Sequence, residues 1–314
     1  MCALGTKHRV DRTECRLLTQ GGHFNGPRLR PALCSLKRPA NCQHSAGFLF
    51  RISLFVLGDG MLRTSDFSLA FIVLWCLAPA AANAGPPYRT DDPEPTPLGH
   101  YEVYTFSTGT VVRDDRSGSL PTFELNYGLI PNGQLTIDAS EAFDRPSGGP
   151  LQYGYGDTPI SFKYRFIEED EQGWRPQVAV FPLVQLPTGD QSRDLGAGHV
   201  LAFLPMWFQK SFGDWTIDGG GGYWINRGGA GDKNFWFSGL LLQRKVSDKL
   251  SLGGEIFHQT ADAIDSHDST GFNFGAIYDF NEHNHFLFSA GRGLQNADTT
   301  NDFSWYVGFL FTGP

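Results

Sequence analysis

One segment, residues 303–311 (FSWYVGFLF), constrains the fold more than any other part of the chain. Every second position carries an apolar side chain: Phe303, Trp305, Val307, Phe309 and Phe311. A period of two is typical of a β-strand with two unlike faces. A soluble protein that left so apolar a strand at its edge would risk aggregation. In a closed barrel one face meets lipid and the strand pairs with the first strand, so we predict an outer-membrane β-barrel.

The composition of the chain changes near residue 84. All five cysteines lie within the first 76 residues, and residues 1–63 are basic. Residues 85–314 carry 15 Lys or Arg against 29 Asp or Glu. This acidic part has no run of 18 apolar residues, which excludes a helical membrane protein. Its charge also argues against nucleic-acid binding, which requires a basic surface.

Residues 61–84 have the layout of a signal peptide. A short basic region begins at Met61, residues 67–77 are almost entirely apolar, and Ala82-Asn-Ala84 gives the small-x-small pattern that signal peptidase cleaves. The apolar stretch is shorter than the roughly 20 residues that a transmembrane helix needs. We therefore expect cleavage after Ala84 and export to the outer membrane.

Residues 1–60 do not resemble any part of an ordinary secretory signal. They are basic, contain cysteines and lack sustained periodicity. A signal peptide starts at its basic region, so a long stretch before that region is unexpected. We interpret residues 1–60 as an unstructured upstream extension from a start codon assigned too early, with a functional extension as the alternative.

The remaining chain predicts one β-domain. Residues 85–99 are rich in proline and indicate an extended periplasmic arm, too short to plug a barrel fully but long enough to enter its lumen. Residues 100–314 divide into about twelve strand candidates of about ten residues each. These candidates lie near residues 100–112, 119–128, 134–142, 158–167, 175–187, 199–211, 214–226, 234–246, 250–261, 270–281, 285–294 and 302–311.

Several of these candidates alternate apolar and polar residues. In residues 160–166, Ile, Phe, Tyr and Phe alternate with Ser, Lys and Arg. The apolar face would be the core of a soluble sandwich or the lipid-facing surface of a barrel, and periodicity alone does not separate the two. Short turns near residues 131, 213, 248 and 282 alternate with longer polar loops. This alternation favours the bacterial barrel.

Tryptophans near the strand ends also fit a membrane barrel. They are Trp174, Trp207, Trp215, Trp224 and Trp236. In a membrane barrel such residues form girdles at the two interfaces, although tryptophan also anchors the cores of sandwiches. We interpret these five as interfacial.

Four motifs stand out in the acidic part of the chain. They are Pro87-Tyr-Arg-Thr-Asp-Asp-Pro-Glu-Pro95, Tyr155-Gly-Asp-Thr-Pro-Ile-Ser-Phe-Lys-Tyr-Arg-Phe166, Phe181-Pro-Leu-Val-Gln-Leu-Pro-Thr-Gly-Asp190 and Gly219-Gly-Gly-Gly-Tyr223. With them, nearly all of residues 85–314 resembles the outer-membrane barrels grouped as the family of the meta-pathway of phenol degradation, often labelled transporter-like. The resemblance implies an outer-membrane barrel that acts as a channel for hydrophobic or aromatic compounds. These motifs are structural rather than catalytic.

Charged residues on the polar strand faces are candidates for the lumen lining. They are Glu124, Asp138, Lys163, Arg165, Asp218, Glu255 and Asp279. In a water-filled lumen such charges determine selectivity. In a narrow barrel they would instead form a packed interior held by ion pairs, without conduction. The sequence leaves both interpretations open.

Two further motifs lie in loops or glycine-rich strands. The family-motif loop, Pro187, Thr188, Gly189 and Asp190, is either an external loop that gates or binds a solute or a turn whose backbone angles suit Pro and Gly. The run Gly219–Gly222 lacks the Lys-Ser/Thr that follows a phosphate loop. It predicts a tight bend, or close packing of lumen contents against the wall.

Catalytic and metal sites find little support in the sequence. His285 and Ser289 share a strand face but lie about 13 Å apart at about 3.3 Å per residue, too far for a serine nucleophile and its base. His283 and His285 form a His-x-His pair at a tight turn, where we expect solvent exposure rather than metal binding. We expect no catalytic residue, no metal and no cofactor.

These observations together predict one all-β domain, an antiparallel transmembrane β-barrel of about twelve strands preceded by a signal peptide. Its expected function is the passive passage of small molecules, with hydrophobic and aromatic compounds as the implied candidates. The alternatives are a non-conducting structural or surface-interaction barrel and, third, an outer-membrane hydrolase. Expected partners are outer-membrane lipid and lipopolysaccharide, the barrel-insertion machinery through the C-terminal strand, and a small solute, but no nucleic acid.

Overall fold

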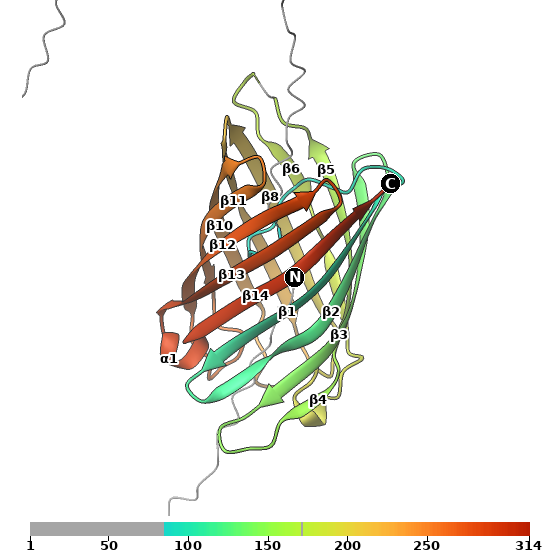
Figure 1. The fold of residues 1–314 in the computed structure, drawn as a ribbon. Coiled ribbons are helices and arrows are strands. Elements are labelled where there is room, and N and C mark those ends of the chain that lie inside the picture. The colour runs from blue at the N-terminus through green and yellow to red at the C-terminus, as the bar shows by residue number, and fades with distance from the viewer. Residues whose placement is uncertain (1–84, 171) are drawn as a thin grey trace, which may run out of the picture. The chain divides into compact units, whose positions relative to one another are not determined.

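The computed structural model describes residues 85–170 and 172–314, which form a closed antiparallel β-barrel (Figure 1). The upstream extension and the signal peptide expected in residues 1–84 lie outside the described residues. No helix in the described part of the chain is long and apolar enough to cross a membrane. The strands are β1 (Tyr101–Val112), β2 (Asp115–Ile130), β3 (Gly133–Arg145), β4 (Gln152–Tyr155), β5 (Thr158–Ile167), β6 (Gln177–Val180), β7 (Leu183–Leu186), β8 (Leu201–Phe212), β9 (Trp215–Asn226), β10 (Phe235–Ser247), β11 (Leu250–Gln259), β12 (Ser269–Asn281), β13 (Asn284–Gln295) and β14 (Phe303–Gly313), with the short helices η1 (Gln191–Arg193) and α1 (Ala297–Thr300).

The fourteen strand segments make twelve barrel strands. β4 and β5 both pair with β3 and form one barrel strand, which is interrupted at Gly156 and Asp157. β6 and β7 both pair with β5 and with β8, and form another, which is interrupted at Phe181 and Pro182. The prediction of about twelve antiparallel strands is therefore confirmed.

The barrel closes between its first and last strands. β14 pairs antiparallel with β1 from Tyr101↔Gly313 to Val111↔Phe303. Phe303, Val307 and Phe309 point outward and are exposed, whereas Tyr306 and Leu310 point inward and are buried. The alternation in residues 303–311 thus gives one lipid-facing and one interior face, as predicted.

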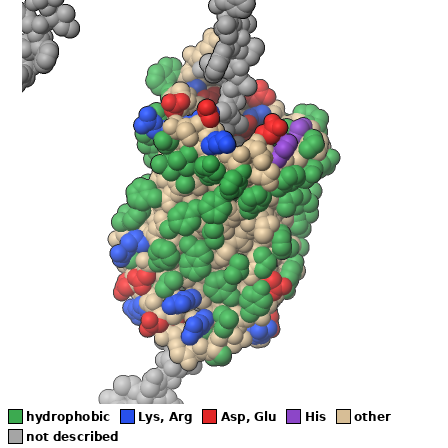
Figure 2. Space-filling model, in the orientation of Figure 1, with side chains coloured by type: hydrophobic (Ala, Val, Ile, Leu, Met, Phe, Trp, Pro, Cys, Tyr) green, Lys and Arg blue, Asp and Glu red, His purple; other side chains and the backbone are tan. Residues whose placement is uncertain are grey.

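The outer surface of the barrel is apolar around its middle. Figure 2 shows hydrophobic side chains across the middle of one face, with charged side chains gathered toward the two ends. On β8, the even-numbered residues Leu204, Met206 and Phe208 are exposed, whereas the odd-numbered Phe203 and Trp207 are buried. An apolar belt on a closed barrel suits contact with acyl chains, because closure leaves no unpaired backbone groups at a sheet edge.

The two ends of the barrel differ in their connections. At the end where β1 begins and β14 ends, tight turns join β2 to β3, β8 to β9, β10 to β11 and β12 to β13. The longer connections predicted from the sequence lie at the opposite end, with the tight β1–β2 turn. We assign the tight-turn end to the periplasm, as in bacterial barrels. Residues 168–176, between β5 and β6, form a longer connection at this periplasmic end.

The prediction that all five tryptophans are interfacial is wrong for two of them. Trp207 and Trp224 point into the barrel and are 0% and 5% exposed, whereas Trp236 points outward and is 59% exposed. Trp215 is also exposed, and Trp174 lies in the β5–β6 connection. The Trp207 ring has space in the interior because Gly220 of β9 carries no side chain; a Cβ there would lie 3.0 Å from the ring. Gly220 also has a φ of 141°, a backbone conformation that favours glycine.

We predict that an arginine on the outer face is costly only at mid-barrel. Leu240→Arg, midway along β10, should destabilise the barrel by about 2–4 kcal/mol, whereas Val246→Arg, near the turn, should cost at most about 1 kcal/mol. Both residues are exposed on the same outer face and differ in depth. Urea unfolding in lipid vesicles, followed by tryptophan fluorescence, measures both values. Equal costs at the two positions would contradict the lipid-facing assignment.

Candidate functional site: the barrel lumen

The arm, residues 85–99, which we predicted to be a periplasmic segment long enough to enter the lumen, extends into the barrel (Figure 1). Tyr88 and Thr90 are buried among strands β10–β13, and Leu98 forms a bridge with Gly128 near the periplasmic end of β2. The arm therefore crosses the lumen from one wall to the other. Its polar backbone groups are satisfied there by side chains of the interior wall, which accounts for its inward position.

Glu255 on β11 anchors the deepest part of the arm. Its carboxylate accepts hydrogen bonds from the backbone N–H of Arg89 at 2.9 Å, the backbone N–H of Thr90 at 2.8 Å and the Thr90 hydroxyl at 2.9 Å. Asn273 of β12 donates a further bond to the same carboxylate at 2.6 Å. Hydrogen bonds to an ionised acceptor are stronger than neutral ones, so Glu255 is the main attachment point on this wall.

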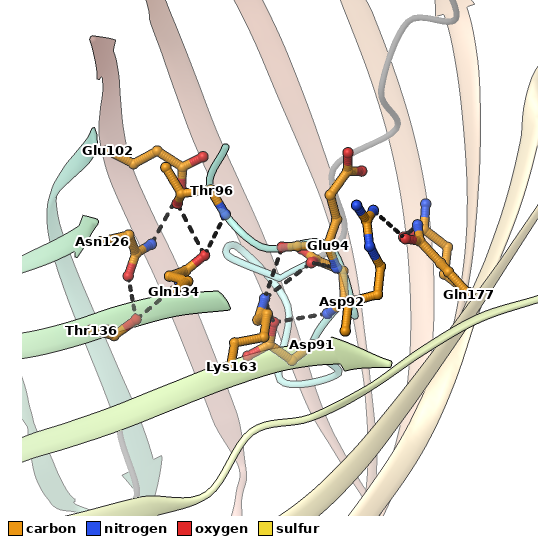
Figure 3. A network of polar contacts seen from close by, with 12 residues as sticks. Asp91, Asp92, Glu94, Thr96, Glu102, Asn126, Gln134, Thr136, Lys163 and Gln177 are labelled. Carbon is orange, nitrogen blue, oxygen red and sulfur yellow. Dashed lines mark hydrogen bonds and ion pairs between the residues drawn. The ribbon is translucent and has the colours of Figure 1, made fainter. Parts of the chain in front are cut away.

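Lys163 on β5 holds the arm against the opposite wall. Its side chain is 4% exposed, and its Nζ lies 3.2 Å from Asp91 Oδ1 and 3.0 Å from Asp92 Oδ1 (Figure 3). It also donates to the Glu94 carbonyl oxygen at 3.4 Å. One buried cation therefore binds three residues of the acidic motif in the arm, Asp91, Asp92 and Glu94.

A chain of neutral hydrogen bonds continues from the arm along β3 and β2. The Thr96 backbone N–H and hydroxyl donate to Gln134 Oε1, and Gln134 donates to Thr136 at 2.9 Å. Thr136 donates to Asn126 Oδ1 at 2.6 Å, and the Asn126 amide donates to Glu102 at 3.2 Å (Figure 3). The arm is thus coupled through wall side chains to the Glu102 carboxylate.

Burial shifts the pKa values of three residues of the arm. It raises the pKa of Tyr88, with the nearby Glu255 carboxylate acting in the same direction. Burial also raises the pKa of Asp92, and Lys163 opposes this shift. The pKa of Glu94 is raised by burial as well, opposed by Arg165 and Lys163. The arm therefore places carboxyl groups in a poorly solvated part of the lumen.

Glycines on three neighbouring strands make room for the arm. A Cβ at Gly239 of β10 would lie 2.2 Å from the Thr90 hydroxyl oxygen. A Cβ at Gly253 of β11 would lie 2.5 Å from the Tyr88 hydroxyl, and one at Gly275 of β12 would lie 2.8 Å from the Tyr88 ring. Larger residues at these positions would exclude the arm, so the glycines shape its groove.

Toward the extracellular end, the interior surface is aromatic. Phe203 stacks on Trp224 with ring centroids 4.6 Å apart, and Trp207 and Phe257 each contact Phe237 at 6.4 Å. We call these five residues the aromatic wall. The Arg89 guanidinium lies over the ring of Phe257 at 4.4 Å, within the range of a cation–π interaction. The arm thus meets the aromatic wall through its arginine.

Toward the periplasmic end, the arm and the wall enclose a cavity of about 150 Å³. We call it the acidic cavity, because six carboxyl groups line it. Two of them, Asp91 and Asp92, bind Lys163, and the other four are those of Glu94, Glu102, Glu124 and Asp138. The apolar part of the lining comes from Tyr104, Phe181 and Leu183. The lumen therefore has an aromatic half and an acidic half, separated by the arm.

The seven sequence-predicted lumen residues lie on interior faces. Five are buried: Glu124, Asp138, Lys163, Asp218 and Glu255. Arg165 donates to Gln177 at 3.0 Å and to Asn132 at 2.8 Å, and Asp279 accepts a bond from His285 at 2.6 Å near the periplasmic turn. The structure brings Glu124 and Asp138 together as direct cross-strand neighbours, but it places Glu255, Asp218 and Asp279 on other walls.

The family-motif loop is built into the extracellular end. Asp157, from the interruption between β4 and β5, accepts hydrogen bonds from the backbone N–H of Gly189 at 3.0 Å and of Ala197 at 2.7 Å. Thr188 donates to the Gly156 carbonyl oxygen at 2.9 Å. Asp190 is exposed and bonds only locally, to Ser192. These contacts support the interpretation of this motif as a structural turn.

The histidine and serine pairs named from the sequence do not come together. Ser289 donates to the Pro87 carbonyl oxygen at 2.5 Å, and His285 binds Asp279. His283 contacts the Thr312 carbonyl oxygen at 3.0 Å. Within residues 85–170 and 172–314, no group of three or more His, Cys, Asp or Glu residues is arranged to hold a metal ion.

This architecture, a closed twelve-strand antiparallel barrel with an apolar outer belt, defines the chain as an outer-membrane β-barrel. Residues 92–305 match the model of the family described as "Putative MetA-pathway of phenol degradation". Because the match spans more than half of the chain, the protein belongs to this family. The resemblance found in the sequence is therefore confirmed.

Solved structures with the same fold include outer-membrane proteins of several kinds. An outer membrane channel from Pseudomonas putida F1 is similar with a TM-score of 0.57 at 15% sequence identity, over 70% of this chain and 98% of that chain. The NanC porin has a TM-score of 0.48 at 8% identity, over 67% and 98%. Outer membrane phospholipase A from Escherichia coli has a TM-score of 0.38 at 12% identity, over 74% and 95%. No curated protein matches this chain.

We predict that filling the groove expels the arm. Gly253→Val should place methyl groups against Tyr88 and expose the arm, because overpacking costs about 1–3 kcal/mol. A cysteine introduced as Thr90→Cys should then react with a maleimide about tenfold faster. Gly254→Val is the control, since a side chain there meets only Phe274 on the outer face of the same strand. Equal labelling rates in the two variants would contradict the groove.

We also predict that Asp157 holds the extracellular loop. Asp157→Ala removes the acceptor for two backbone N–H groups, each worth about 1.5–3 kcal/mol when bonded to a charge. Trypsin should then cleave after Arg193 faster, as followed by gel electrophoresis. Asp265→Ala, at an exposed position of the β11–β12 connection, should leave the cleavage rate nearly unchanged. The same cleavage rate in both variants would refute this role.

Proposed function

We propose that the protein is a channel for the passive passage of small molecules across the outer membrane, with hydrophobic and aromatic compounds as its solutes. The observation that carries this proposal is the divided lumen. An aromatic wall near the extracellular end and a cavity near the periplasmic end lie on the two sides of the arm. The aromatic wall is packed together and Arg89 of the arm lies on the Phe257 ring, so a ring-bearing solute would contact this wall when the arm is displaced.

Membership of the phenol-degradation family supports the choice of aromatic solutes. The fold shared with the Pseudomonas putida outer membrane channel supports a channel without naming its solute. The apolar outer belt supports a location among outer-membrane lipids, with lipopolysaccharide at the extracellular side. Recognition of β14 by the barrel-insertion machinery remains a prediction. No covalent step is needed for this function, and Ser289 and His285 are engaged with other groups.

A non-conducting barrel is the main alternative, because the arm fills part of the lumen. The arm is held mostly by polar contacts to Glu255 and Lys163. Such contacts are replaced by water when they break in a hydrated lumen, so their net contribution is about 0.5–1.5 kcal/mol for a neutral bond and about 1.5–3 kcal/mol for a charged one. An arm held in this way can be displaced while the barrel remains folded.

We predict that the protein gives stable single-channel steps in planar lipid bilayers and that small aromatic solutes reduce them. Glu255→Ala removes the acceptor of three hydrogen bonds from the arm, so it should increase the conductance or the frequency of opening. Glu282→Ala, at an exposed periplasmic turn, is the matched control and should behave like the unmodified protein. A folded, heat-modifiable barrel without conductance, in both the unmodified protein and Glu255→Ala, would reject the channel and favour the structural alternative.

A further inference from the structure

Two arginines face each other on the wall of the barrel at its extracellular end. Arg116 of β2 and Arg145 of β3 are direct cross-strand partners near the tight β1–β2 turn (lower end in Figure 1). Both residues are exposed. Like charges directly opposite each other in a sheet are destabilising. A bound anion would therefore stabilise this pair.

An aromatic row beside the arginines shows which face and which depth they occupy. The Phe143 ring stacks with Trp305 of β14 at a centroid distance of 6.5 Å, and Trp305 shares the outer face with the exposed Val307. Alternation along β3 therefore places Arg145, and with it Arg116, on the outer face as well. Aromatic residues mark the membrane interface of barrels. The arginines lie one row farther from mid-membrane, at the level of the lipid headgroups.

The N–H groups of the two guanidinium groups are free to bind a ligand. In the part of the chain that the structure describes, neither arginine forms a side-chain hydrogen bond or an ion pair. Asp115 and Asp144, next to them in the sequence, fall on the interior face by alternation. Glu141 lies on the outer face of β3, but two residues nearer to mid-membrane than Phe143. The outer face thus presents unbonded donors at the headgroup level.

An apolar groove lies on the same strands, nearer to mid-membrane. β1 and β2 have an irregular register at residues 106–108 and 119–122, and the groove lies at these irregularities. Its lining includes Thr105, Leu120, Pro121, Phe286, Val307 and Phe309. At about 3.3 Å per residue, Leu120 lies about 13 Å along β2 from Arg116. The surface therefore combines donors for an anionic headgroup with a groove for an acyl chain below it.

We infer that Arg116 and Arg145 bind a phosphate group of lipid A, the phosphorylated glycolipid anchor of lipopolysaccharide, with one of its acyl chains in the groove. A guanidinium group pairs with phosphate through two parallel N–H···O bonds, and two neighbouring guanidinium groups can share one phosphate. The inference goes beyond the proposed function, because it concerns the outer surface and holds whether or not the barrel conducts. It gives the lipopolysaccharide around the barrel a defined binding site.

Titration of the detergent-solubilised protein with lipid A tests the site. Native mass spectrometry measures the affinity for the first lipid bound. Diphosphoryl lipid A should bind at least about tenfold more tightly than lipid A from which both phosphates have been removed. Equal affinities would overturn the inference. Inorganic phosphate in excess should not displace the lipid; displacement would indicate a site for free phosphate and would also overturn it.

Single-charge variants locate the site. Arg116→Gln and Arg145→Gln should each weaken the binding of diphosphoryl lipid A about tenfold and leave that of phosphate-free lipid A nearly unchanged. Arg292→Gln is the matched control, because Arg292 is also exposed on the outer face toward the extracellular end, but its partner across the sheet is Phe272. Equal losses in all three variants would indicate a general attraction to surface charge and refute the site.

Heat stability separates lipid binding from a structural role of the arginines. In phosphatidylcholine vesicles, Arg116→Gln should unfold at the same temperature as the unmodified protein or higher, because it removes a repulsion between like charges. In vesicles that contain lipid A it should unfold at a lower temperature, because bound lipid stabilises the folded state. A lower temperature in both would overturn the inference. A protein dimer that excludes lipid A in native mass spectrometry would place a second copy on this face, with the same consequence.

Discussion

The pairing of β14 with β1 is the contact on which the rest of the structure depends. In lipid an unpaired backbone N–H or C=O has no water to bind, so an open edge would cost several kcal/mol per group. β1 and β14 form eleven consecutive Cα pairs, from Tyr101↔Gly313 to Val111↔Phe303, and so leave no open edge between them. Once the sheet is closed, every strand must have one face toward lipid and one toward the lumen. The apolar belt and the polar interior both follow from this closure.

Closure explains why the wall was predictable from the sequence and the lumen was not. Lipid is a uniform environment, so outward positions in the middle of the barrel are mostly apolar, and the period of two is visible within a single strand, as in residues 303–311. The interior is different, because its contacts join distant strands. Glu255 binds Arg89 across 166 positions, and Lys163 binds Asp91 across 72. Alternation placed Glu255 and Lys163 on interior faces but did not reveal their partners.

The misassigned tryptophans show the same limit. Trp207 and Trp236 both lie in apolar strands, and the residue type alone does not show which of them points into the barrel. An inward tryptophan needs space beside it, and for Trp207 this space comes from Gly220, its direct partner on the neighbouring strand. The sequence shows this glycine but not the side chain that faces it. The position of the arm was left open for a similar reason, since a proline-rich segment has no period that points toward or away from a barrel.

The wall and the arm also differ in what their hydrogen bonds contribute. A backbone bond between two strands in lipid has no competing partner, so its loss is costly. The bonds between Glu255 and the arm are also buried, but they join the wall to a segment outside the sheet, and water can replace them once the arm moves. The arm can therefore be released while the barrel around it remains closed. A lumen whose contents are held less strongly than its wall can change its width without unfolding, and such a lumen is compatible with the selective passage of small solutes.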